Sequence, residues 1–117
     1  MNIKIMRFAD FQFKQGEQVT VRRGTEWDIG HQHDPTRIGG AEGPCRGHIR
    51  IVDTAALQSI FHVPTDEDGL IIRHHAGWNV GQLCEFFRTQ CPHWKPSIEI
   101  VTLVRFEVLE LFEQAQP

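Results

Sequence analysis

The segment GEQVTVRRGTEW, residues 16–27, opens at a turn glycine and then alternates in side-chain character like a strand. Alternate residues of a strand share a face, so Val19 and Val21 are predicted to point together. The opposite face carries an amide, a hydroxyl and a guanidinium, from Gln18, Thr20 and Arg22. Polar side chains aligned in this way suggest either a solvated strand surface or a binding face.

Composition places the chain among ordinary globular domains. Its 117 residues predict one domain, 1–117, and 40% hydrophobic residues with eight Phe are enough for a single core. The formal net charge is −3, which gives no overall basic signature. The first fifty residues carry eight Lys or Arg against six Asp or Glu, and the rest carry four against nine. A local anion-binding patch in the N-terminal half is therefore permitted.

The cysteines and the start of the chain bear on the compartment. The three Cys are an odd number, and the start MNIKIMRFAD alternates instead of forming the apolar run of a secretion signal. No stretch approaches the roughly 18 apolar residues of a membrane span. The sequence therefore predicts reduced thiols, no membrane association and a cytoplasmic setting.

Periodicity predicts a small α+β fold, a curved sheet or partial barrel with two or more flanking helices. Strands are predicted at residues 2–8, 18–23, 48–53 and 98–112, the last being one long strand or two with a bend. Helices are predicted at 54–61 and 80–90, the second with Asn79 and Gln82 as a capping box. The glycine-rich residues 24–47 are predicted to form a long loop, and 70–77 fit either strand or helix.

The order of these motifs resembles that of the ASCH domain, a family of the PUA-like superfamily. The resemblance rests on the turn glycine followed by VTVR (19–22), a basic glycine-rich exit, a helix and the terminal VTLVRFEVL (101–109). It implies a small mixed β-barrel with flanking helices and a central cleft. It also implies binding of RNA or of modified bases, and some small bacterial members are N4-acetylcytidine amidohydrolases.

The catalytic residues of these N4-acetylcytidine amidohydrolases are only partly matched in this sequence. Thr20 and Arg22 match the family's Thr and Arg, but its Lys falls on Glu17, or on Gln18 with a shorter turn. The Glu expected before the main helix falls near Ala76, and no acid lies in residues 70–84. A replacement base would have to be His74 or His75, because imidazole titrates near neutrality. We therefore expect no appreciable hydrolysis of N4-acetylcytidine.

Seven residues are the candidate ligand contacts. Guanidinium groups offer planar paired donors to phosphates or base edges, and aromatic faces stack on bases. The candidates are Gln18, Thr20, Arg22, Arg23, Trp27, His75 and Trp78. The alternative for each is structural: solvated strand face for the arginines, core packing for the tryptophans. Trp94 is expected to pack or to lie in a surface loop.

A histidine and cysteine pattern raises the question of zinc. His-x-His and Cys-x-x-His could supply four ligands, from His31, His33, Cys45 and His48. The spacing matches no established zinc pattern, and the ligands would come from loop ends. We therefore expect neither a metal nor another cofactor.

Three functions remain open on the sequence alone. The first is a module that binds RNA or a modified nucleoside or nucleotide in a cleft. The second is a nucleoside amidohydrolase or ribonuclease-type enzyme with an atypical site, using Thr20 with His75 or Glu17. The third is a protein-interaction domain whose partner contacts the acidic C-terminal strand. Oligomeric state is not encoded in any pattern that we identify.

Overall fold

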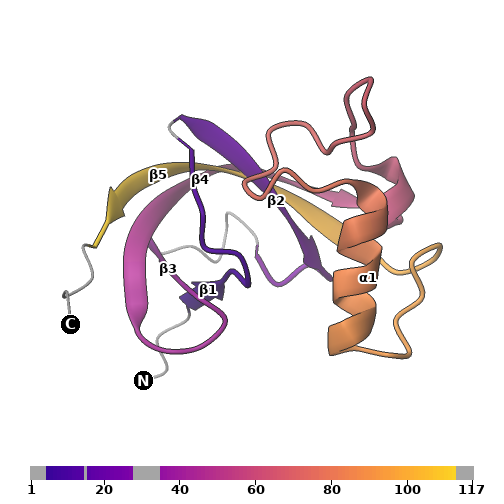
Figure 1. Ribbon diagram of the computed structural model, residues 1–117, viewed down its shortest axis with the longest axis horizontal. Helices are drawn as coiled ribbons and strands as arrows, with labels where there is room; N and C mark the ends of the chain where they lie inside the picture. Colours follow the sequence, from indigo (N-terminus) through magenta and orange to yellow (C-terminus); the bar gives the residue numbers. More distant parts are fainter. Residues whose placement is uncertain (1–4, 15, 28–34, 113–117) are drawn as a thin grey trace.

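The computed structural model describes residues 5–14, 16–27 and 35–112, and its framework is one five-stranded sheet (Figure 1). The strands lie in the order β1 (Ile5–Arg7), β3 (Thr36–Gly39), β4 (Cys45–Leu57), β5 (Val101–Leu111) and β2 (Glu17–Arg23). β1 and β3 are parallel, and the other neighbours are antiparallel. Within the segment quoted at the outset, residues 17–23 therefore form an edge strand, β2, which pairs along its whole length with β5.

The sheet is bent by irregular pairing in its long central strand. The register of β4 against β5 shifts after His48 and again after Ile51, and such bulges increase local twist. At Gly47 an added Cβ would stand 2.5 Å from the Glu110 carbonyl oxygen, so the close approach of the two strands requires glycine there. Among the described strands β1 and β2 are the edges and do not pair with each other, so the sheet does not close into a barrel.

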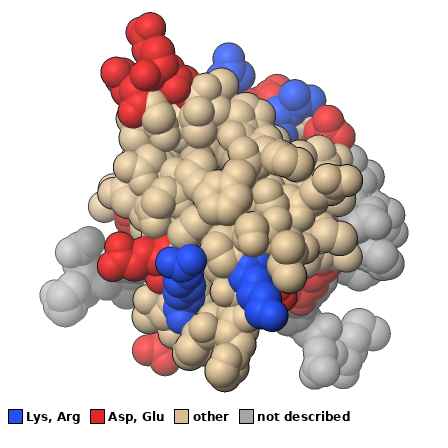
Figure 2. Space-filling model, turned by 90° about the vertical axis from the view of Figure 1, so that its right-hand side faces the viewer, with Lys and Arg blue, Asp and Glu red and all other residues tan. Residues whose placement is uncertain are grey.

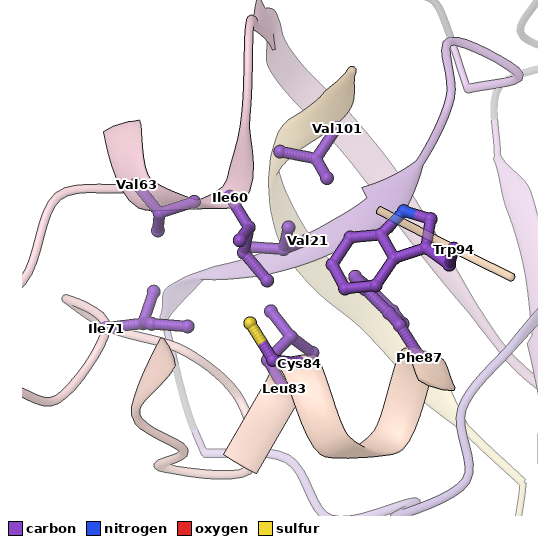
Figure 3. Close-up of a cluster of buried hydrophobic side chains, with 9 residues drawn as sticks. All are labelled: Val21, Ile60, Val63, Ile71, Leu83, Cys84, Phe87, Trp94 and Val101. Atoms are coloured by element: carbon purple, nitrogen blue, oxygen red, sulfur yellow. The ribbon is translucent and has the colours of Figure 1, made fainter. Parts of the chain in front are cut away.

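Opposite faces of the sheet carry separate hydrophobic clusters. One cluster lies under the N-terminal segment and contains Met6, Phe8, Trp27, Ile38, Ile49, Val104 and Phe106. The other is drawn in Figure 3 and contains Val21, Ile60, Val63, Ile71, Leu83, Cys84, Phe87, Trp94 and Val101. Along β5, Leu103 packs against the second cluster while the adjacent Val104 belongs to the first, because side chains alternate along a strand.

The helix α1 (Val80–Gln90) covers the second cluster. Its capping box is complete: Asn79 Oδ1 accepts from the Gln82 amide at 2.8 Å, and Gln82 Oε1 accepts from the Asn79 amide at 2.8 Å. Leu83 and Phe87 are buried against the sheet, while Phe86 is half-buried. The predicted helix, its cap and its packing are confirmed.

Two predictions about local structure are wrong. Residues 54–57 continue β4, because they pair with Leu103 and its neighbours on β5, and only the short 3-10 helix η2 (Ile60–His62) follows. Residues 24–47 are not one loop, because they contain β3 and the start of β4. Long-range strand pairing overrides local propensity in both places. As a result, in the described part of the chain, one α-helix and the short η2 flank the sheet where two or more helices were predicted.

The remaining strand predictions are confirmed, with adjusted ends. The strand predicted at 98–112 is one continuous strand, β5, and the strand predicted at 48–53 forms the middle of the longer β4. β1 covers residues 5–7 of the predicted 2–8, while residues 1–4 lie outside the described part of the chain. No described helix is long and apolar enough to cross a membrane.

Candidate functional site

A cleft of about 250 Å³ lies at the end of β2. Residues 7–10, residues 74–78 and α1 form its other walls. Its walls combine cationic, aromatic, imidazole and carboxylate side chains. The lining residues on which the site depends are Phe8, Asp10, Thr20, Val21, Arg22, Arg23, Glu26, Trp27, His74, His75, Trp78 and Phe87. Six of the seven candidate contacts therefore meet in one cleft, although they come from two separate segments of the sequence, residues 20–27 and 75–78.

The cleft lies at the edge of β2 and receives side chains from both faces of that strand. Thr20 and Arg22 share one face, and Arg22 lies over the Phe8 ring, with 4.3 Å from Cζ to the ring centroid. Arg23 points to the other face and lies 5.9 Å from the centroid of Phe87 on α1. The opposite orientation predicted for the two arginines is confirmed, yet both line the cleft because it extends across the strand edge.

Arg22 is fixed in place and incompletely satisfied. Its Nη1 donates to the Arg7 carbonyl oxygen, while its buried Nε has no hydrogen-bond partner among the described residues. Burial lowers the pKa of Arg22 to about 10, an effect that the negative charge of Glu26 opposes. The guanidinium therefore stays charged near neutral pH, and its Nε–H is left without a partner among the described residues.

The adjacent histidines are buried and neutral. Burial, reinforced by the charge of Arg22, lowers the pKa of His74 to about 4. For His75 burial, then the neighbouring His74 and Arg22, lower the pKa to about 3. His74 Nδ1 accepts from the Ala76 amide at 3.2 Å, whereas His75 Nδ1 is buried without a partner in the described part of the chain. An imidazole of this kind suits hydrogen bonding better than proton transfer at neutral pH.

Aromatic rings form much of the wall. Trp78 is half-buried, stacks on His74 with centroids 5.9 Å apart and an interplanar angle of 17°, and lies 5.3 Å from Phe86. Trp27 is only 7% exposed and belongs to the cluster around Phe106, so most of its surface is used in packing. Both tryptophans line the cleft, but of the two only the half-buried Trp78 keeps a substantial free surface.

Some sequence candidates lie elsewhere. Gln18 is buried beside the Lys14 carbonyl, to which its side-chain nitrogen donates, and it does not line the cleft. Glu17, where the resemblance places the catalytic Lys, pairs with Arg105 at 3.3 Å on the sheet surface. Trp94 is buried against Phe87, as one of its two predicted placements required.

The structure adds residues that the sequence did not single out. Asp10 and Glu26 bring carboxylates into the cleft, and Phe8 lies beneath both Arg22 and His75, the latter at 4.7 Å between ring centroids. The acids occur in irregular segments with no motif, so no sequence signal indicated them. Phe8 could have been found from the alternation in residues 2–8, which puts Met6 and Phe8 on the same strand face.

Of the four residues in the histidine and cysteine pattern, the structure describes Cys45 and His48. Cys45 donates its thiol to the Gly47 carbonyl at 3.2 Å, and His48 lies 3.4 Å from a Glu110 carboxylate oxygen. His31 and His33 lie outside the described residues. Within the residues that are described, no three His, Cys, Asp or Glu side chains are grouped as metal ligands.

Comparisons with family models, with curated proteins and with solved structures each return no match.

Proposed function

We propose that this chain is a binding module of the ASCH and PUA-like kind that holds a nucleobase-containing ligand, a nucleoside or a short single-stranded RNA, in the cleft beside β2. The observation that carries the proposal is the convergence of six candidate contacts in that one cleft. Two of them, Arg22 and His75, bring buried nitrogens without partners among the described residues. Buried polar atoms are normally paired, so these two nitrogens favour a site completed by a ligand.

The size and charge of the site favour a small ligand. About 250 Å³ is slightly below the roughly 300–1,000 Å³ of sites for drug-sized molecules, which suits one base or nucleoside. On the face seen in Figure 2, described Lys and Arg side chains are scattered among uncharged surface and do not form a track. Tight binding to a long duplex depends on many phosphate contacts, so an isolated or unpaired base is the better fit.

The roles follow from the geometry. The half-buried Trp78 supplies a stacking face, Arg22 supplies a charged N–H donor, and His75 supplies a neutral ring nitrogen. Thr20 is 2% exposed and contributes a hydroxyl at the deep side of the cleft. Arg23 lies at the rim, where a charge affects encounter with an anionic ligand more than the bound geometry.

The test is calorimetric titration with nucleosides, including N4-acetylcytidine, and with a short single-stranded RNA. Trp78→Ala and Arg22→Ala are each expected to weaken binding by about 1–3 kcal/mol, whereas Arg23→Ala should mainly alter its salt dependence. Arg50→Ala is the matched control, because Arg50 is paired with Glu107 on the exposed surface of β4. Melting curves would establish that each variant folds. Equal effects of Arg22→Ala and Arg50→Ala, or no binding by the wild type, would contradict the proposal.

The second candidate is hydrolysis of a nucleoside amide. The presence of Asp10 and Glu26 in the same cleft as Thr20 favours it, because carboxylates can act as general bases. Against it, His75 with a pKa of about 3 is a weak base, and Thr20 is buried. We expect no release of acetate from N4-acetylcytidine. Hydrolysis of N4-acetylcytidine by the wild type that is abolished by Thr20→Ala would show instead that the protein is an enzyme.

A further inference from the structure

The main-chain N–H and C=O groups of the odd-numbered residues of β2 point away from β5, toward the open edge of the sheet. The Val19 amide donates to the Arg73 carbonyl at 2.9 Å, and the Val19 carbonyl accepts from the His75 amide at 3.1 Å. Both bonds point away from β5. The Gly24 amide instead donates toward the β5 side, to Ile100, at 2.8 Å. Since bonding alternates in an antiparallel pair, the N–H and C=O of Val21 face the open edge, as those of Val19 do.

The segment that covers this edge ends before it reaches Val21. It forms a single parallel bridge between Val19 and His74, and Arg73 there takes a φ of 57°. The chain then turns away, with the Gly77 amide donating to the His74 carbonyl at 2.9 Å and a φ of 68° at Gly77. This segment therefore leaves the outward-facing main-chain groups of Val21 uncovered, and Val21 is one of the residues that line the cleft.

Val21 has no main-chain partner on its outer edge among the described residues, although the residue is only 3% exposed. A buried N–H or C=O without a partner costs about as much as a lost hydrogen bond, so such groups are nearly always satisfied. Because Val21 lines the cleft, a ligand or its water can satisfy both groups. Strand geometry fixes the donor and acceptor side by side, which makes this a rigid element of the site.

We propose that the N–H and C=O of Val21 read the polar edge of the ligand, and that the ligand is a base presenting an acceptor next to a donor. This inference rests on the proposed function and specifies its ligand chemistry. A ring nitrogen beside an amino group, as in cytosine, satisfies the pair, as does a carbonyl beside a ring N–H, as in uracil. The site should therefore discriminate weakly between unmodified bases and strongly against those whose donor is replaced by alkyl groups.

A series of nucleosides tests which hydrogen-bonding groups the base must present to Val21. Uridine and cytidine should bind within a few-fold of each other. Removing the donor leaves the Val21 carbonyl unpaired, so 3-methyluridine and N4,N4-dimethylcytidine should bind about tenfold or more weakly. If the methylated compounds bind as well as their parents, the inference is wrong while the proposed function stands.

Amide hydrogen exchange of the 15N-labelled protein tests the residue itself. Without ligand, the Val21 amide should exchange faster than the Val19 and Thr20 amides, which are bonded to the 73–75 segment and to β5 respectively. Saturating uridine should slow exchange at Val21 and leave Val19 unchanged. Binding without any change at Val21 would overturn the inference alone. Absence of uridine and cytidine binding would overturn the inference together with the proposed function.

Discussion

At the scale of single residues, Trp27 and Trp78 share the cleft but differ in surroundings. Trp27 is 7% exposed within a hydrophobic cluster, whereas Trp78 is half-buried and stacks on His74. Trp27→Ala should therefore destabilise the fold by about 3–5 kcal/mol, as large-to-small core substitutions do. Trp78→Ala should mainly weaken ligand binding, by about 1–3 kcal/mol. Denaturant unfolding and calorimetric titration of both variants measure the two effects, and the reverse ranking would contradict these assignments.

The second residue-scale prediction concerns acid stability. His75 has a pKa of about 3 in the folded chain against an ordinary value near 6.5, because burial disfavours the charged ring. The unfolded chain therefore takes up the proton first as the pH falls. Titration of His75 therefore does not affect the free energy of unfolding above about pH 6.5. Below that pH it lowers the free energy of unfolding progressively, down to about pH 3.

Replacing His75 by Gln removes this titration. The slope of unfolding free energy against pH between about 6 and 4 should fall by up to about 1.4 kcal/mol per pH unit. The matched control is His93→Gln, the same substitution at an exposed histidine that does not line the cleft. Urea unfolding at a series of pH values provides the measurement. Parallel curves for the wild type and the His75 variant would refute the assignment of a buried neutral ring.

At the scale of elements, the capping box of α1 supports one wall of the cleft. Asn79 and Gln82 satisfy each other's amides, and the helix that they begin carries Leu83 and Phe87. Asn79→Ala should lower the unfolding free energy by about 0.5–2 kcal/mol, as loss of an N-cap does. Thr89→Ala, on the exposed last turn of α1, is the control and should cost less. Equal losses measured by denaturant unfolding would show that the cap is not what fixes the helix.

The close approach of β4 to β5 gives the next prediction. A Cβ at Gly47 would meet the Glu110 carbonyl oxygen at 2.5 Å and Leu111 Cδ2 at 3.0 Å, so the strands must separate. Gly47→Ala should cost about 1–3 kcal/mol in thermal or urea unfolding, as overpacking does. Gly81→Ala on α1 is the control, since its Cβ meets only a side-chain oxygen at 3.4 Å and alanine favours helices. A Gly47 variant as stable as the wild type would show that the pairing relaxes freely.

At the scale of the whole molecule, the sequence predicted what depends on local pattern. The strand at 18–23, the opposite orientations of Arg22 and Arg23 and the capped helix all follow from side-chain period and capping chemistry. The sequence failed where distant pairing decides. Residues 54–57 have the composition of a helix start but are held in β4 by β5, which lies over forty residues later.

The residues of the cleft also divide into those that the sequence predicted and those that only the fold brings together. Arg22, Arg23 and Trp27 were predictable because they belong to one motif, residues 16–27, and Trp78 was selected as an aromatic residue just before the predicted helix. Asp10 and Glu26 were not, because the folding of two irregular segments against β2 brings them in. The partial burial that separates Trp78 from Trp27, and the open main-chain edge at Val21, are properties of packing and topology. Neither can be obtained from the order of residues alone.

The central claim is that the cleft beside β2 binds a nucleobase, and a 15N NMR titration with uridine and cytidine tests it most directly. The account predicts saturable shift changes in the amides of residues 20–23 and 74–78 and in the first turns of α1, which together surround the cleft. Arg50 and Arg105, paired with acids on the exposed sheet surface, should show no change. Absence of any shift at millimolar nucleoside, or shifts centred on Arg50 and Arg105, would contradict the account.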